Sequence, residues 1–218
     1  ERRGHPGPAL SIADILTALY FQVMHTDPKN PGSSERDRLI VSKGHASIGL
    51  YAALAERGYF PRSELSTFRR LNSRLQGHPD MKRTPGVDMT SGSLGHGIAA
   101  GVGMALAAKL DKKAYRVFVV VGDGELQEGL IWEAAMSASR YKLDNLVVIA
   151  DLNGFQSCGS VSEIMPLGDL RSKWRSFGWD VVSCDGHNMS ELLDCLGDNS
   201  AEGKPRIVLA STVKGKGV

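Results

Sequence analysis

The sequence contains only three cysteines in 218 residues, namely Cys158, Cys184 and Cys195. Their spacing fits no metal-binding pattern, and an odd number of cysteines without a disulfide framework is typical of proteins in a reducing cytoplasm. No apolar run approaches the roughly 20 residues that a membrane-spanning helix needs, and no segment resembles a signal peptide. We therefore expect a cytoplasmic protein that does not associate with membranes.

The sequence also lacks an excess of charge of either sign. It has 26 Lys and Arg residues against 24 Asp and Glu, which gives a formal net charge of +2. Such a balance argues against a surface that binds nucleic acid or anionic lipid. The chain contains no internal repeat and no low-complexity segment, and its length fits one large domain or one subunit of a larger assembly.

What the sequence does contain is a central strand–helix–strand unit. An apolar, β-branched run at 117–121 predicts a buried strand that ends at Gly122-Asp123-Gly124. A helix follows, and a second apolar strand at 146–150 leads to Asn153. In an open parallel sheet, ligands bind just outside the carboxyl ends of the strands. The two polar clusters therefore belong at one binding edge of the sheet.

The residue types at this edge are those that bind a hard cation next to a phosphate. Asp123 offers a carboxylate, Asn153 an amide oxygen and Phe155 a backbone carbonyl, and Mg²⁺ prefers oxygen ligands completed by phosphate and water. Either cluster alone is more often a simple turn, because Gly-Asp-Gly and Asn-Gly are common turn sequences. Their combination, thirty residues apart at consecutive strand ends, favours the binding site.

Three histidines stand beside glycines at the ends of predicted elements. His5 precedes a helix at 12–24, in which Ser11 and Asp14 resemble a capping box. His45 follows a short strand at 39–41, and His78 follows a predicted helix at 61–71. A single such histidine is more often a surface loop residue. Three of them suggest imidazoles that bind phosphate, donate to an oxyanion or move protons near pH 7.

Two further glycine-rich segments have open interpretations. The sequence from Thr90 to Gly97 opens a helix at 98–110, and it is either a phosphate site or a close helix contact. The Lys-Gly repeat around Lys214 either meets anions or forms a flexible tail. The pattern is completed by predicted helices near 170–177 and after Asn188 and by predicted strands at 179–184 and 207–210. The alternation predicts an α/β fold with a mostly parallel central sheet and helices on both faces.

Taken together, the motifs resemble those of transketolases, in the amino-terminal half of these enzymes. The resemblance extends from Gly4 to Val218 and rests on GHPG (4–7), SKGH (42–45), QGHPD (76–80), GSLGHG (92–97), GDGELQEG (122–129), Asn-Gly (153–154) and TVKGKG (212–217). It implies a thiamine diphosphate-binding fold in which residues 1–218 form a single diphosphate-binding domain. Other thiamine diphosphate enzymes share the GDG and Asn pair but lack this set of Gly-His motifs.

The resemblance also implies roles for individual residues. Asp123, Asn153 and the carbonyl of Phe155 are expected to hold Mg²⁺, or Ca²⁺ or Mn²⁺ in its place. His5, His45 and His78 are expected to be catalytic and to line the substrate channel, and Glu128 is expected to communicate across a dimer interface. The residues implied in cofactor binding are His45, Gly92, Ser93, Leu94, Gly122, Asp123, Gly124, Glu125, Glu128, Asn153, Phe155 and Lys214.

The activity implied is the transfer of a two-carbon ketol unit from a ketose, or ketose phosphate, to an aldose-type acceptor. The glutamate that activates the thiamine ring belongs to a separate pyrimidine-binding domain in this family. We expect that domain, with the carboxy-terminal domain, on a second subunit in an α₂β₂ assembly.

Alternatives are a thiamine-dependent 2-oxoacid decarboxylase or lyase subunit, and a transketolase-like enzyme of specialised metabolism. His96 and Cys158 depart from the family pattern near the cofactor loops, and they favour a non-standard substrate.

Overall fold

The computed structural model describes residues 4–157, 159–197 and 201–218, and Cys158 lies outside these residues. Within them, five strands form one sheet in which every neighbouring pair is parallel. The strands, in their order across the sheet, are β1 (Arg38–Val41), β2 (Val117–Gly122), β3 (Leu146–Leu152), β7 (Arg206–Ser211) and β6 (Asp180–Asp185). The predicted parallel α/β fold is confirmed.

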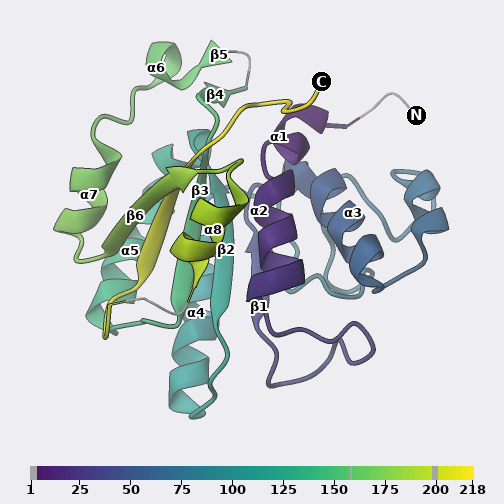
Figure 1. The fold of residues 1–218 in the computed structure, drawn as a ribbon, viewed down its shortest axis with the longest axis horizontal. Coiled ribbons are helices and arrows are strands. Elements are labelled where there is room, and N and C mark those ends of the chain that lie inside the picture. The colour runs from purple at the N-terminus through teal and green to yellow at the C-terminus, as the bar shows by residue number, and fades with distance from the viewer. Residues whose placement is uncertain (1–3, 158, 198–200) are drawn as a thin grey trace.

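Helices cover both faces of this sheet (Figure 1). Successive residues of β2 point to opposite faces: Phe118 and Val120 belong to one hydrophobic cluster, and Val117, Val119 and Val121 to the other. The first cluster includes residues of α2 (Ala13–Ala18), α3 (Ser47–Arg57) and α8 (Met189–Leu196), and the second includes residues of α4 (His96–Leu110), α5 (Gly129–Arg140) and α7 (Leu170–Ser176). Because both faces are covered, the strands are continuously apolar rather than alternating.

The remaining elements are short and most lie near the ends of the strands. They are α1 (Pro6–Leu10), a π-helix (Leu19–Val23), three 3₁₀ helices (Gly44–Ala46, Arg62–Thr67 and Gly124–Gln127), α6 (Val161–Ile164) and an antiparallel pair, β4 (Phe155–Gln156) with β5 (Gly159–Ser160). The predicted binding turns after β1 and β2 thus each contain a 3₁₀ helix, and the predicted turn after β3 leads into a hairpin.

The predicted capping box at Ser11 and Asp14 is wrong. Ile12, rather than Ser11, precedes α2, and no side chain caps this helix. The hydroxyl of Ser11 donates instead to Oδ2 of Asp151 at 2.7 Å. Ser11 is fully buried and directed toward this carboxylate, so its oxygen does not accept the N–H groups at the start of the helix as a cap would.

The predicted helix at 61–71 is also wrong in its second half. A 3₁₀ helix covers Arg62–Thr67, and turns follow it. Arg69 and Asn72 adopt positive φ angles of 59° and 65°, which no right-handed helix can contain. The backbone N–H of Arg69 donates to the carbonyl of Leu75 at 2.8 Å, closing a loop that leads to His78.

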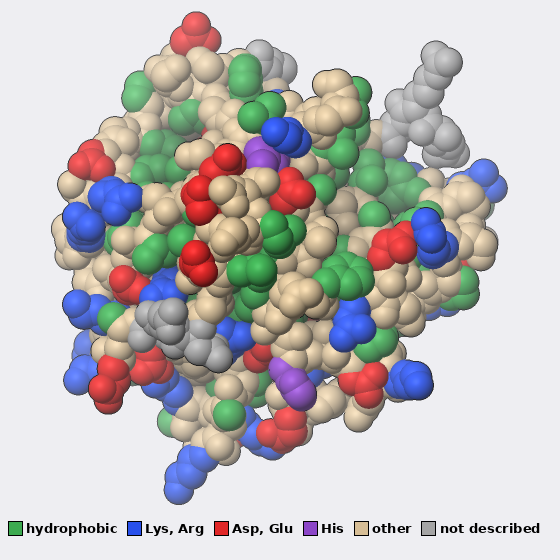
Figure 2. All heavy atoms as spheres, viewed as in Figure 1, with side chains coloured by type: hydrophobic (Ala, Val, Ile, Leu, Met, Phe, Trp, Pro, Cys, Tyr) green, Lys and Arg blue, Asp and Glu red, His purple; other side chains and the backbone are tan. Residues whose placement is uncertain are grey.

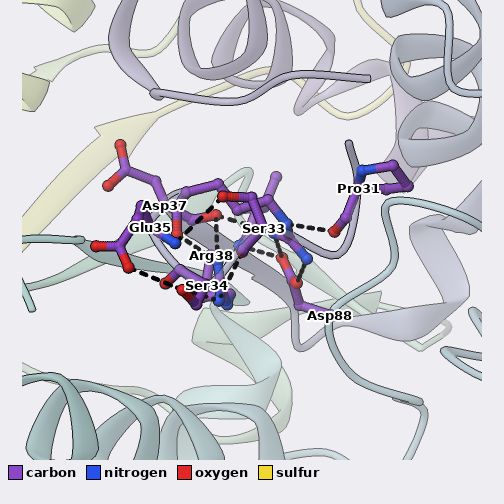
Figure 3. Close-up of polar contacts among 9 residues, drawn as sticks. Pro31, Ser33, Ser34, Glu35, Asp37, Arg38 and Asp88 are labelled. Carbon is purple, nitrogen blue, oxygen red and sulfur yellow. Dashed lines mark hydrogen bonds and ion pairs between the residues drawn. The ribbon is translucent and has the colours of Figure 1, made fainter. Parts of the chain in front are cut away.

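A polar cluster fixes the opposite, amino-terminal end of the sheet (Figure 3). Asp88 is 8% exposed, and its carboxylate forms an ion pair with Arg36 and accepts the N–H of Leu39 at 2.8 Å. This contact holds the start of β1 and is far from the ligand-binding ends of the strands.

Acidic and basic side chains are interspersed on the face shown in Figure 2, in keeping with the small net charge. Among the described residues, no helix is both long and apolar enough to cross a membrane.

Candidate functional site at the carboxyl ends of the strands

The turn after β2 presents the carboxylate of Asp123. Gly122 ends the strand, and the next residues form the 3₁₀ helix Gly124–Gln127. Asp123 is only 4% exposed, and its Oδ1 accepts the N–H of Gly124 at 3.0 Å. Burial raises the pKa of this carboxyl, while hydrogen bonds from Gly154 and Gly124 act in the opposite direction. A buried carboxylate with few partners is suited to binding a cation.

The turn after β3 lies directly against this carboxylate. The N–H of Gly154 donates to Oδ2 of Asp123 at 2.7 Å, and Gly154 adopts a left-handed φ of 78° that glycine tolerates best. Oδ1 of Asn153 accepts the N–H of Phe155 at 3.1 Å. The structure thus brings together the two predicted clusters, although thirty residues separate them in the sequence.

These residues fit a divalent cation that is bound mainly through its other ligands. Their oxygen donors are the type that Mg²⁺ prefers. Among the described residues, no group of three or more His, Cys, Asp or Glu side chains surrounds a possible metal position. A cation here therefore needs further oxygens, and a diphosphate provides them. The carbonyl of Phe155 has no contact that assigns it, so its role as a ligand stays a prediction.

A cavity of about 500 Å³ opens above these two turns. All of the predicted site residues line it except His78, Gly92 and Ser93. It is also lined by residues that the sequence did not single out, namely Pro8, Lys43, Gln127, Gln156 and Ser157. Its walls come from the segments after β1, β2, β3 and β7, from the start of α1 and from the loop before α4, as expected for a ligand site in an open parallel sheet.

Two of the three predicted histidines face each other in this cavity. The ring centroids of His5 and His45 lie 5.5 Å apart in an edge-to-face arrangement. Burial lowers the pKa of His45 to about 4, and the charges of Lys43 and His5 add to this effect. His45 is therefore neutral at pH 7, so one ring nitrogen is available to accept a proton.

His78 is near this pair but outside the cavity wall. Its side chain is exposed and packs against Gly92, where an added Cβ would lie 3.0 Å from Cδ2 of His78. Gly92 therefore lies in a second layer with His78. The charge of His78 nevertheless contributes to the lowered pKa of His45.

Glu125 joins three of the predicted motifs. Its Oε1 accepts hydrogen bonds from the hydroxyl of Ser42 and from the N–H of Gly95, the latter at 2.8 Å, and its Oε2 accepts the N–H of Gly122 at 3.1 Å. The side chain is 2% exposed, and burial raises the pKa of its carboxyl. Glu125 therefore braces the SKGH, GSLGHG and GDG turns against one another. The neighbouring Glu128 packs on Gly95, where an added Cβ would lie 3.0 Å from Cβ of Glu128.

The Lys-Gly segment packs against the first motif of the chain. The N–H of Gly215 donates to the carbonyl of Gly7 at 3.1 Å, and the ammonium of Lys214 lies 5.4 Å from the centre of the Phe155 ring. Val213 donates its N–H to Nε2 of His187 at 2.9 Å. These contacts favour a packed segment over a flexible tail, and the binding of an anion by Lys214 stays a prediction.

The feature that sequence reasoning missed is a buried ion pair below the cavity. Lys43 is 1% exposed and pairs with Asp151, which is fully buried at the end of β3. The sequence signal for this pair is a lysine within the SKGH motif and an aspartate two residues before Asn153. Charged residues are almost never fully buried without a partner.

Comparisons with known proteins agree with this class of site, a diphosphate-binding edge of a parallel sheet. The family model for the transketolase thiamine diphosphate-binding domain matches residues 1–218. The chain is 51% identical over 215 residues to the 6-deoxy-6-sulfo-D-fructose transketolase subunit SqwG of Clostridium sp. strain MSTE9. The matched region is 98% of this chain and 78% of that protein. It is 45% identical to an apulose-4-phosphate transketolase subunit from Actinobacillus succinogenes, and that match covers 99% of this chain and 78% of the relative.

Solved structures show the same fold. The transketolase of Campylobacter jejuni superposes with a TM-score of 0.92 at 37% identity, covering 98% of this chain and 35% of that one. Human transketolase is 40% identical over 216 residues, and the chain spans 34% of its length. The chain belongs to the transketolase family, whose members are thiamine diphosphate-dependent transferases. The domain that it represents is the one that binds this cofactor.

Proposed function

We propose that this chain is the thiamine diphosphate-binding subunit of a two-chain transketolase. The observation that carries the proposal is the kind of relative that it matches. Proteins named as transketolase subunits are matched over 78% of their length, whereas human transketolase is matched over 34%. On this proposal, residues 1–218 form a single diphosphate-binding domain. A second subunit supplies the pyrimidine-binding and carboxy-terminal domains, the assembly is α₂β₂, and the cytoplasm is its location.

We propose that the divalent cation lies between the turns after β2 and β3. Asp123, Asn153 and the carbonyl of Phe155 are its protein ligands, and Mg²⁺ is the ion, with Ca²⁺ or Mn²⁺ as substitutes. The contact between Asp123 and Gly154 supports this placement, because it holds both turns at one point. The diphosphate then faces Gly124, His45 and Lys214, which line the same cavity. Leu94 contacts the cofactor, and Gly92 and Ser93 support that loop.

Thiamine diphosphate, when bound, supplies the electron sink that breaking and forming a bond beside a carbonyl requires. The protein must then orient the sugar and move protons. His45 is neutral at pH 7, so a nitrogen of its imidazole can accept a proton from a substrate hydroxyl and return it. His5 lies beside His45 in the cavity and holds a neighbouring hydroxyl, and His78 acts from outside the cavity wall, where its charge still reaches His45.

The substrate class is proposed from the names of the relatives. One is named for a sulfonated ketose and another for a ketose phosphate. Both names describe sugars with an anionic group. We infer that the donor is a ketose with an anionic end and that the enzyme serves specialised rather than central sugar metabolism. A 2-oxoacid decarboxylase remains the second candidate from the sequence, but no contact in the site favours it.

The test is to purify the tagged chain from its native organism and identify what co-purifies. A stoichiometric partner of roughly 300 residues with its own α/β domain is expected. The complex should transfer two carbons from a ¹³C-labelled ketose phosphate to an aldehyde without releasing CO₂. Release of CO₂ from a 2-oxoacid would support the decarboxylase instead. A chain that purifies without a partner would contradict the two-chain proposal.

A further inference from the structure

The fully buried carboxylate of Asp151 collects hydrogen bonds from four side chains. Its Oδ2 accepts from the hydroxyl of Ser11 at 2.7 Å, from the amide of Asn153 at 2.9 Å and from the ammonium of Lys43. Its Oδ1 accepts from the hydroxyl of Thr212. Ser11 lies at the end of α1, and Lys43, Asn153 and Thr212 lie after β1, β3 and β7 respectively. One side chain therefore joins four remote parts of the sequence.

Each of these segments also carries a residue of the candidate site. Ser11 follows α1, which has His5 as its N-cap residue, and Lys43 stands two residues before His45. Thr212 stands two residues before Lys214, and Asn153 is itself a proposed cation ligand. Asp151 does not line the cavity, although Lys43 does. Its carboxylate therefore contacts the framework of the site and not the space in which a ligand binds.

The contact with Asn153 has a directional consequence. A carboxylate only accepts hydrogen bonds, so it must face the NH₂ group of the amide and not its oxygen. The Oδ1 atom of Asn153 is consequently turned away from Asp151, where it accepts the N–H of Phe155 at 3.1 Å. A carbonyl oxygen has two lone pairs, so one remains for the proposed cation.

We propose that Asp151 is a positioning residue for the divalent cation and the diphosphate. It acts by fixing the amide of Asn153 and by holding the segments of His5, His45 and Lys214 in register. This inference rests on the proposed function, because it concerns the same site. Groups that orient a metal ligand without touching the metal typically change metal affinity about 10–100-fold when they are removed.

The charge of Lys43 is balanced within the same network by the charge of Asp151. The ammonium is buried, and Asp151 is the carboxylate with which it forms its ion pair. The stem of Lys43 runs past Gly122, where an added Cβ would lie 3.7 Å from Cδ of the lysine. Removal of Asp151 would free this ammonium to move toward the cavity and would release the orientation of Asn153 at the same time.

The test is the substitution Asp151→Asn in the native complex, purified through a tag on this chain. Two quantities are measured: the dissociation constant of thiamine diphosphate over a series of Mg²⁺ concentrations at low temperature, and the Tm. We expect the Mg²⁺ concentration for half-maximal cofactor binding to rise about 10–100-fold. The matched control is Asp88→Asn, which removes another buried carboxylate paired with an arginine, at the opposite end of the sheet (Figure 3). It should lower the Tm and leave cofactor binding unchanged.

A second variant guards against misfolding. In Lys43→Met/Asp151→Asn no buried charge is left unpaired, so the chain is expected to fold, and the same rise in the Mg²⁺ requirement is expected because Asn153 still loses its carboxylate. If both variants bind cofactor as the wild type does and only their Tm falls, Asp151 is merely structural and the inference is overturned. If the wild-type complex itself binds no thiamine diphosphate, the proposed function fails, and the inference fails with it.

Discussion

The backbone N–H of Gly154 donates a 2.7 Å hydrogen bond to Oδ2 of Asp123. This bond joins the turn after β3 to the turn after β2, and it places the proposed cation ligands Asp123 and Asn153 side by side. The two turns are adjacent because β2 and β3 pair in parallel, with Gly122 opposite Asp151 at their ends. The position of the proposed cation is therefore determined by strand register.

Replacement of Asp123 tests this position directly. In Asp123→Ala the cation loses its only proposed carboxylate ligand, and we expect Mg²⁺-dependent binding of thiamine diphosphate to be abolished. Titration of the assembled enzyme with cofactor, with and without Mg²⁺, measures the effect. Asp169→Ala is the control, since Asp169 is an exposed aspartate that caps α7. Cofactor affinity that stayed the same in Asp123→Ala would show that the cation binds elsewhere.

The sheet and this pair of turns could be predicted because they depend on local signals. Runs such as 117–121 and 146–150 are short, apolar and rich in β-branched residues, which is typical of buried strands. Parallel pairing then brings their carboxyl ends together whatever the intervening sequence does. The cap on α8 was predictable for the same reason: Asn188 accepts the N–H groups of Ser190 and Glu191 within three residues of itself.

Features that depend on contacts across the sequence could not be predicted in this way. Ser11 has the sequence of a capping residue, but the carboxylate that takes its hydroxyl is 140 residues away. The helix predicted at 61–71 stops because Arg69 turns back to bond with Leu75. Lys43 looks like an ordinary surface lysine until the strand order places Asp151 beneath it. In each case a tertiary partner overrides the local preference.

The lowered pKa of His45 predicts how this residue titrates. Burial is the main cause, followed by the charges of Lys43 and His5. Measured by NMR in the folded chain, the His45 ring should titrate near pH 4 rather than near 6.5. Between these values the unfolded chain binds a proton here that the folded chain does not, so the free energy of unfolding falls as the pH is lowered through this window. A midpoint near 6.5 would mean that the ring is solvated and that its proton-accepting role needs another explanation.

His78 is expected to affect turnover more than cofactor binding, since it lies outside the cavity wall. In His78→Ala we expect kcat to fall by roughly 10²-fold or more, as for the loss of a group that moves protons. The dissociation constant of thiamine diphosphate should change little. His25→Ala is the control, because His25 is an exposed histidine whose backbone bonds to Asp37 near the other end of the sheet. An equal loss of kcat and cofactor affinity would indicate that His78 binds the diphosphate instead.

Gly124 is predicted to tolerate no side chain. A Cβ at this position would lie 2.7 Å from Cβ of Gln156, so the hairpin after β3 must shift away from the turn after β2. Gly124→Ala should destabilise the folded chain by about 1–3 kcal/mol and weaken cofactor binding. Gly129→Ala is the matched control, because an added Cβ there meets nothing within 4 Å. Thermal unfolding and cofactor titration of both variants separate the two effects, and equal behaviour would show that the hairpin adapts freely.

The most direct test of the two-chain proposal is reconstitution of ketol transfer from separately purified chains. This chain, its co-purifying partner and an equimolar mixture are each supplied with thiamine diphosphate, Mg²⁺, a ketose phosphate donor and an aldehyde acceptor, and two-carbon transfer is followed by ¹³C NMR. We expect transfer by the mixture alone, and its loss when Asp123→Ala replaces the wild-type chain. Transfer by this chain without the partner, or a mixture that remains inactive with every anionic ketose tested, would contradict the proposal.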